Sequence, residues 1–109
     1  MPYLSIKEID KIARQIENKE IVETKEILLL QNKNRNSVAH WLAYHSDTTK
    51  WSTNDKDILK LQDKDEWSVA HQLAKAHPTW KTDDIEILSL YTPDWEETVE
   101  DTLVEEGKR

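Results

Sequence analysis

Four histidines are the side chains of this sequence that titrate near neutral pH, so acid–base catalysis would have to use them. His40 and His45 are five residues apart, which turns them away from a shared helix face, and no His-Glu-x-x-His or comparable metal-binding pattern occurs. The sequence has no cysteine, which excludes thiolate zinc sites and cysteine catalysis. Gly107 is the sole glycine, so neither a phosphate-binding glycine loop nor a glycine-flanked serine nucleophile can form. We therefore expect no catalytic residue, no cofactor and no metal.

Two of the histidines occupy the same place in an internal repeat. Residues 27–40 align without a gap with residues 58–71, at an offset of 31 residues. Both copies continue to Leu-Ala, then to a Trp and a polar stretch, and a third copy follows that degenerates, with Asp101 at the histidine position. Because His40 and His71 recur at one position of the unit, we expect them to have a structural role.

Each copy is predicted to form two short helices. Ser37 and Ser68 are good N-caps for helices that run through Val-Ala-His-x-Leu-Ala, and the linking segments before them are short and polar, as turns are. Thr53 and Thr82 are the expected N-caps of the second helices. No stretch shows sustained alternation of apolar and polar residues, so we expect little or no sheet.

Helices of a different kind are predicted at both ends. Ser5 and Glu8 form a capping box for a first helix, which carries an apolar stripe of Ile6, Ile9, Ile12 and Ile16. Thr92-Pro93 is typical of an N-cap followed by proline in the first turn, and the helix after it places apolar residues at four-residue steps, at Trp95, Val99 and Leu103. Both helices stand where the end caps of a repeat stack belong.

The predicted fold class is all-α, with short stacked helix pairs between helical caps. A helix pair of this size cannot bury its own apolar face, so neighbouring units must cover one another. A length of 109 residues fits one domain, residues 1–109. Within it we expect an N-terminal capping helix in residues 1–19, repeat units in residues 20–90 and an acidic C-terminal capping helix in residues 91–106.

The motif Ser-Val-Ala-His-x-Leu-Ala resembles the Thr-Pro-Leu-His-x-Ala-Ala core of ankyrin repeats, and the period of 29–31 residues is close to the 33 of that family. The resemblance covers about residues 20–106. It implies an ankyrin-like α-solenoid in which Ser37 with His40, and Ser68 with His71, hydrogen-bond within and between units. The family's turn glycine is missing here, which weighs against its long β-hairpin.

The tryptophans divide by the same comparison. Trp51 and Trp80 occupy equivalent positions, so we expect both to pack under the loop between the helices. Trp41 stands where the second unit has Gln72, a slot that faces the concave side in ankyrin-like stacking. Exposed tryptophans are frequent interaction hot spots, so the candidate protein-binding residues are Trp41, Tyr44, Trp67 and Gln72. Partial burial of Trp41 against the N-terminal helix is the alternative.

The net charge of −7 comes from one part of the chain, because residues 82–106 contain ten acidic residues and no Lys or Arg. Such a field repels nucleic acid and attracts basic partners. The candidate acidic surface consists of Asp94, Glu96, Glu97, Glu100 and Asp101. Simple solubilisation of a terminal element is the other interpretation.

Only 37 % of the residues are hydrophobic, so the core must be thin. The longest apolar run is Ile27 to Leu30, far short of the ~20 residues that a membrane span needs, and no apolar signal-peptide segment opens the sequence. We therefore expect a cytoplasmic protein that has no membrane partner.

These observations favour a non-catalytic protein–protein interaction module that binds another protein and no nucleic acid directly. A first alternative is a small acidic inhibitor that mimics nucleic acid, of the kind phages use against defence nucleases, and blocks a basic site on its target. A second is an enzyme that uses His40 or His71. A third is a domain that self-associates through an incompletely capped end, and the oligomeric state stays open.

Overall fold

The computed structural model describes residues 3–94 and 96–109. Within those residues the chain is mostly helical, as the sequence predicts, with eight helices and one two-stranded antiparallel sheet. In chain order the elements are α1 (Ile6–Glu17), α2 (Lys25–Leu28), α3 (Val38–Tyr44), α4 (Ser46–Thr49), α5 (Lys56–Leu59), α6 (Val69–Ala76), α7 (Ile85–Leu88), β1 (Tyr91–Thr92), β2 (Glu97–Thr98) and α8 (Val99–Glu105).

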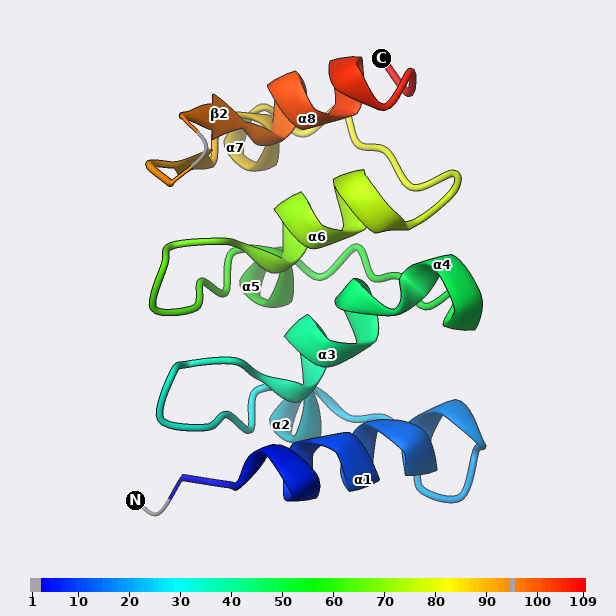
Figure 1. Cartoon of the computed structure of the whole chain (residues 1–109). Helices are drawn as coiled ribbons and strands as arrows, with labels where there is room; N and C mark the ends of the chain where they lie inside the picture. The colour runs from blue at the N-terminus through cyan, green and yellow to red at the C-terminus, as the bar shows by residue number, and fades with distance from the viewer. Residues whose placement is uncertain (1–2, 95) are drawn as a thin grey trace.

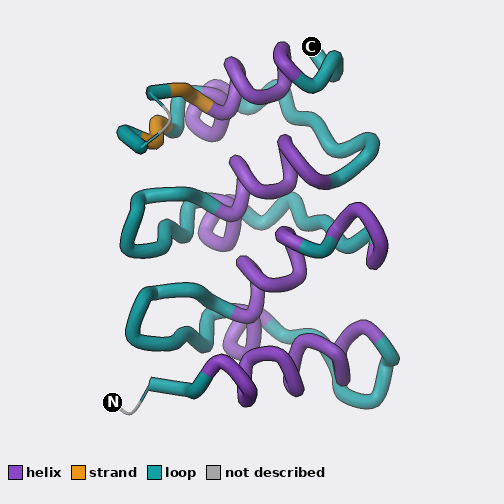
Figure 2. The backbone as a smooth tube through the Cα atoms, viewed as in Figure 1, coloured by secondary structure: helices purple, strands orange, loops and turns teal. Residues whose placement is uncertain are grey.

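The helices lie in two rows. Helices α1, α3, α6 and α8 follow one another in the front row, and the one-turn helices α2, α5 and α7 lie behind them (Figure 1). In the front row α3 packs against both α1 and α6, and α6 packs in turn against α8. The turns that precede α3, α6 and α8 all project on the same side (Figure 2). Helices α1 and α8 therefore form the two ends of a stack whose longest dimension is 34 Å.

The core is continuous from one helix of the front row to the next. Small residues at the contacts, Ala39, Ala43, Ala70 and Ala74, are fully buried and let the helices approach closely. Larger apolar side chains fill the space around them, among them Ile9, Val38, Leu42, Val69, Leu73 and Leu103. Because α3 and α6 each share their buried surface with two neighbours in the front row, a sequence with few hydrophobic residues can still form one core.

Each long helix begins at a residue whose side chain accepts a nearby backbone N–H, and most of the predicted N-caps are confirmed. The Ser5–Glu8 capping box opens α1, and the hydroxyls of Ser37 and Ser68 accept the N–H groups three residues on at the starts of α3 and α6. The caps predicted at Thr53 and Thr82 are wrong. Each of these threonines accepts the N–H of the aspartate two residues later. That aspartate caps the helix, because its side chain accepts two backbone N–H groups of the first turn.

The predicted start of the last helix is also wrong. Thr92 lies in strand β1 instead of capping a helix, and α8 begins seven residues later, at Val99. Its N-cap is Thr98, which forms a capping box with Asp101. This is the position of Ser37 and Ser68 in the repeat, so the third unit keeps the local signal of the first two. Trp95, which the prediction placed on this helix, lies outside the described residues.

The turns before α3, α6 and α8 share one backbone feature. Arg35, Glu66 and Glu96 stand at equivalent positions, two residues before the helix N-cap, and have φ values of 61°, 62° and 51°. In the first two turns Asn32 and Asp63 each accept two backbone N–H groups through the side-chain oxygen. Single β-bridges close these two turns, and the pairing of β1 with β2 closes the third. The turns are therefore short hairpins, although the third-unit sheet has only two residues in each strand.

A series of ion pairs connects the helices of the back row. Lys25 Nζ on α2 lies 2.5 Å from Asp57 and 3.8 Å from Asp55 of the next unit. Lys56 on α5 repeats the arrangement with the following unit, at 2.8 Å from Asp84 and 3.7 Å from Glu86. The hydrogen bond from Lys25 lowers the pKa of the Asp57 carboxyl. Ile85 stands at the lysine position of the third unit, so the series ends there.

The first unit contains a short helix that the second lacks. It has two more residues between its Leu-Ala and its Trp, and this longer segment includes α4, which ends at Lys50 in the left-handed conformation. Within residues 3–94 and 96–109, every helix is too short or too polar to cross a membrane.

Candidate functional site

The two repeated histidines are bound into the stack through both ring nitrogens. His40 Nδ1 lies 2.9 Å from Ser37 Oγ, and its Nε2 lies 3.0 Å from the carbonyl oxygen of Trp67 in the next unit. His71 has the same arrangement, at 2.7 Å from Ser68 Oγ and 3.3 Å from the carbonyl oxygen of Glu97. These are the contacts within and between units that the resemblance implies for the Ser–His pairs.

Both histidines are held as neutral rings. A carbonyl oxygen can only accept, so Nε2 carries the proton and Nδ1 is the acceptor. Burial lowers the pKa of His40 and His71, and the carbonyl of the next unit offsets part of that effect. Neither ring presents a free nitrogen to solvent, so the geometry suits a structural role better than proton transfer to a substrate.

The equivalent tryptophans reach back to the preceding unit. Trp80 is buried and its Nε1 donates to the carbonyl of Thr53 at 3.3 Å. Trp51 is half-buried against the core, and its Nε1 donates to Glu23 at 2.7 Å. The predicted packing role therefore fits both, and each side chain also joins two units through a hydrogen bond.

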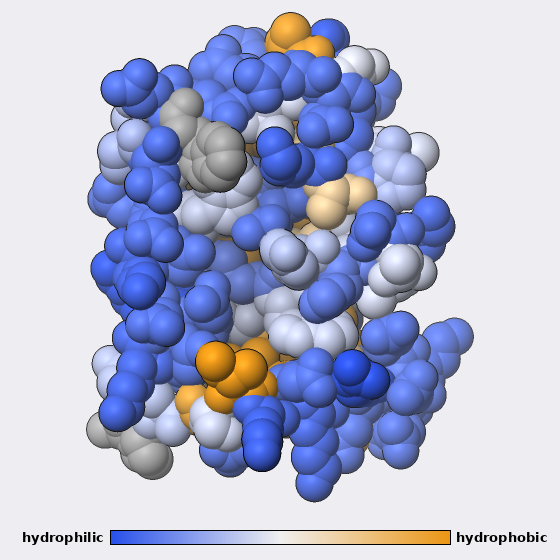
Figure 3. Space-filling model, in the orientation of Figure 1, coloured by the Kyte–Doolittle hydropathy of each residue, from blue (hydrophilic) through white to orange (hydrophobic). Residues whose placement is uncertain are grey.

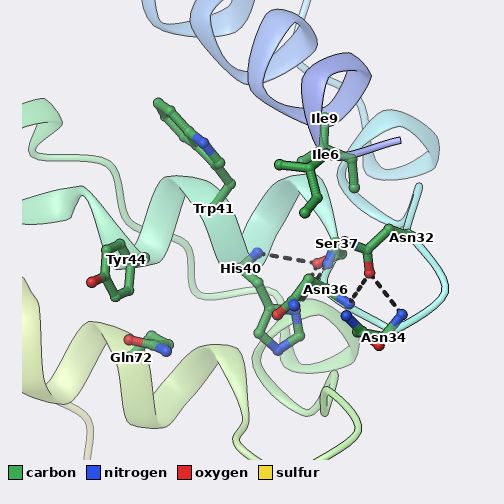
Figure 4. A pocket seen from close by; sticks show the side chains of 10 residues that line it. All are labelled: Ile6, Ile9, Asn32, Asn34, Asn36, Ser37, His40, Trp41, Tyr44 and Gln72. Atoms are coloured by element: carbon green, nitrogen blue, oxygen red, sulfur yellow. Dashed lines mark hydrogen bonds between the residues drawn. The ribbon is translucent and has the colours of Figure 1, made fainter. Parts of the chain in front are cut away.

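A groove opens between the first helices of the front row. Its volume is about 220 Å³, and Figure 4 shows its lining side chains converging from four segments. Ile6 and Ile9 come from α1, Trp41 and Tyr44 from α3, and Gln72 from α6, while Asn32, Asn34 and Asn36 of the first turn line the remaining side together with Ser37 and His40. None of these side chains carries a permanent charge. Apolar atoms also gather on this part of the surface, near the α1 end of the stack (Figure 3).

Two of the groove side chains are largely exposed. Tyr44 is 63 % exposed and Ile6 is 70 % exposed, although the sequence pattern places Ile6 on the apolar stripe of α1. Trp41 is half-buried, and its ring lies 4.2 Å from that of His45, which in turn lies 5.0 Å from the ring of Tyr44. Both aromatic side chains of the groove therefore pack against His45.

The groove brings together three of the four predicted protein-binding residues: Trp41, Tyr44 and Gln72. The expectation that Trp67 is an exposed aromatic is wrong. It is only 7 % exposed, and its ring lies 4.9 Å from that of His71. Sequence comparison placed it opposite Asn36 in a turn, but that comparison could not show that this turn folds back against α6.

The remaining groove residues could not be selected from the repeat alone. Ile6 and Ile9 belong to the N-terminal helix, outside the repeat, and Asn32 and Asn34 look like ordinary turn residues. The available signal was the apolar stripe of α1. This stripe begins at Ile6, one helical turn before Ile9, which is the first buried residue of the helix. It could have indicated that one end of the stripe stays exposed.

The predicted acidic surface is smaller than the sequence indicates. Asp94, Glu96, Glu100 and Asp101 are exposed, but Glu97 is buried and accepts a hydrogen bond from Thr102 Oγ1 at 2.9 Å. The Asp101 carboxylate also accepts the Thr98 N–H in the capping box, and Glu100 pairs with Arg109 at 3.0 Å. Several of these acids therefore already have local partners.

The part of the chain that the structure describes contains no group of three or more His, Cys, Asp or Glu side chains placed to hold a metal ion. No protein-family model, curated protein or solved structure matches this chain.

Proposed function

We propose that this chain is a non-catalytic protein–protein interaction module built from ankyrin-like repeats. Three features support the ankyrin-like part of the proposal. The Ser–His pairs bond within and between units, equivalent hairpin turns precede three front helices, and the turns lie on one side of the stack. In such an arrangement the turns and front helices together form the surface that reads a partner.

The groove is the observation that carries the interaction part. It combines an apolar floor with amide side chains and two exposed anchors, Ile6 and Tyr44. Its volume of about 220 Å³ is below the roughly 300–1,000 Å³ of small-molecule sites, which suits one or two side chains of a protein partner better than a cofactor. Tyrosine and tryptophan are also common among residues that dominate binding energy.

The test is affinity capture from cells that encode the protein, with quantitative mass spectrometry of the captured proteins. The bait carrying Ile6→Ser and Tyr44→Ala should lose its specific partner. Removal of two anchors typically costs at least about 2 kcal/mol of binding free energy, or roughly thirtyfold in affinity. Both positions are exposed, so the stability of the bait should change little.

The matched control bait carries Val22→Ser and Tyr91→Ala, which remove an aliphatic and an aromatic side chain that are 78 % and 49 % exposed outside the groove. This bait should keep the partner. If both baits retain every protein that the unaltered chain captures, the groove is not the binding surface.

A further inference from the structure

The outer side of α8 corresponds to the side by which α3 packs against α6 and α6 packs against α8. Glu100 and Val104 occupy the positions of Ala39 and Ala43 in α3, which are fully buried, while Val104 itself is 55 % exposed. Asp101 likewise replaces the histidine that reaches into the next unit. The outer face of α8 therefore carries polar and exposed residues at positions that are buried in α3.

This end face is acidic. We define it by Glu100, Asp101, Val104 and Glu105, all exposed and all on the side of α8 opposite its buried residues. The two cations that follow it do not neutralise it fully. Lys108 turns inward to the carbonyls of α6, and Arg109 pairs with Glu100 and with Asp83.

At the opposite end of the stack, the outer side of α1 carries three cations, although Glu8, Asp10 and Glu17 make the helix as a whole neutral. The buried residues of α1 are Ile9, Ala13 and Ile16. Lys7, Lys11 and Arg14 follow the spacing i, i+4, i+7 on the other side of the helix, away from α3, and all three are exposed. Among the described residues Arg14 pairs with Asp10, whereas neither Lys7 nor Lys11 has a carboxylate within 4 Å.

We infer that the α1 end of one molecule binds the α8 end of a second copy, so that the protein associates head to tail. The two faces have opposite charge, and each is the outer side of a single helix at one end of the same row. The contact extends the front row, with α1 of one copy beside α8 of the other, as α6 lies beside α8 within a molecule. The charged residues of both end faces lie outside the groove.

Net charge does not prevent this contact. Two molecules of charge −7 repel at long range, but at 0.1 M ionic strength charges are screened beyond about 10 Å, well below the 34 Å length of the stack. The apposed ends therefore interact mainly through their own residues. Since two single helices bury little area and the pairs are exposed, the association is weak and sensitive to salt.

The first measurement is sedimentation of the full chain over a concentration series. At 0.1 M salt the average mass should rise above the 12.9 kDa monomer at concentrations of roughly 0.1–1 mM, and at about 1 M salt it should return to the monomer value. A head-to-tail contact leaves one free end of each kind, so the mass should keep rising with concentration beyond the dimer.

Two charge-reversal variants identify the surfaces. The first carries Lys7→Glu and Lys11→Glu, and the second carries Glu100→Lys and Glu105→Lys. At 0.1 M salt each variant alone should stay monomeric, because its α1 and α8 ends now carry charge of the same sign. An equimolar mixture of the two should associate again and grow beyond the dimer. The unaltered α8 end of the first variant is complementary to the unaltered α1 end of the second, and the reversed α8 end of the second is complementary to the reversed α1 end of the first.

The control variants make the same changes of charge on exposed residues away from both ends: Lys50→Glu with Lys64→Glu, and Asp47→Lys with Asp65→Lys. Both should associate as the unaltered chain does. The inference is overturned by a monomer at every concentration, by end variants that still associate, or by a mixture that stays monomeric. Capture of a basic protein by an otherwise monomeric chain would assign the α8 end to a different partner and would equally overturn it.

Discussion

Arg35, Glu66 and Glu96 hold a left-handed backbone conformation that costs a residue with a side chain roughly 1–2 kcal/mol relative to glycine. We predict that Glu66→Gly raises the free energy of unfolding by about 1 kcal/mol, because glycine adopts this conformation without the steric cost. Urea unfolding measures the change. Lys64→Gly in the same turn is the control, since Lys64 has no positive φ and should lose stability instead. Equal changes in the free energy of unfolding at the two positions would show that the left-handed backbone of Glu66 carries no steric cost.

The buried histidines make stability depend on pH. Burial lowers the pKa of His40, His71 and His77 in the folded state, so the unfolded chain binds more protons once the pH falls below about 6.5. Stability is therefore fully present above that pH and decreases as the pH falls toward 5. We expect a loss of at least about 1 kcal/mol between pH 7.5 and pH 5 in urea unfolding.

Histidine substitution tests the origin of this dependence. The variant His71→Gln should be less stable at pH 7.5, because it disturbs two buried hydrogen bonds, and its stability should vary less between pH 7.5 and 5. A variant with unchanged stability and unchanged pH dependence would contradict the structural role. It would return His71 to the candidates for catalysis.

At the scale of the elements, the C-terminal end of α6 depends on a residue near the end of the chain. Lys108 Nζ donates to the Ala74 carbonyl at 2.6 Å and also bonds the carbonyls of Leu73 and His77. The Ala74 carbonyl lies in the last turn of α6, where helix carbonyls lack an intrahelical partner, and a cation there also complements the helix dipole.

We predict that Lys108→Met, which keeps the aliphatic stem, lowers the free energy of unfolding by about 1–3 kcal/mol, because hydrogen bonds to a charged group are lost. Lys81→Met removes an exposed lysine elsewhere and should change stability by less than about 0.5 kcal/mol. Thermal unfolding followed by circular dichroism measures both. Equal melting temperatures for the two variants would show that Lys108 does not support α6.

The helices that sequence reasoning located correctly are those whose start is a local event. Ser5, Ser37 and Ser68 each accept an N–H three residues away, so four consecutive residues determine the cap. Thr53 and Thr82 failed because an aspartate two residues later competes for the same role and binds two N–H groups. Local competition between good capping residues was not resolved by propensity alone.

Features that depend on contacts between distant parts of the chain could not be predicted from the repeat. The burial of Trp67 depends on how its turn packs against α6, and the groove depends on the placement of α1 beside α3. Neither is encoded in one repeat unit. The repeat did reveal Trp41, Tyr44 and Gln72 as candidates, because a slot that accepts both Trp and Gln cannot be part of a tightly packed core.

At the scale of the whole molecule, the continuous core predicts cooperative unfolding. Leu73 is completely buried in α6, between α3 and α8. Leu73→Ala should cost about 2–5 kcal/mol through the cavity that it leaves. Circular dichroism and tryptophan fluorescence should still follow one transition, because the units share their buried surface. Two separate transitions would show that the stack unfolds in parts. Tyr91→Ala, at a half-exposed strand position, is the mild control.

The ion pairs of the back row repeat from one unit to the next. Lys25 meets Asp55 and Asp57, and Lys56 meets their equivalents in the following unit. Excision of residues 58–86 would join two equivalent points of the repeat and leave Lys25 with the same acids. His40 would then face the Glu97 carbonyl, which now accepts from His71. These two kinds of contact between units would therefore survive the loss of a whole unit, so gain or loss of units is a route by which such a protein can change length during evolution.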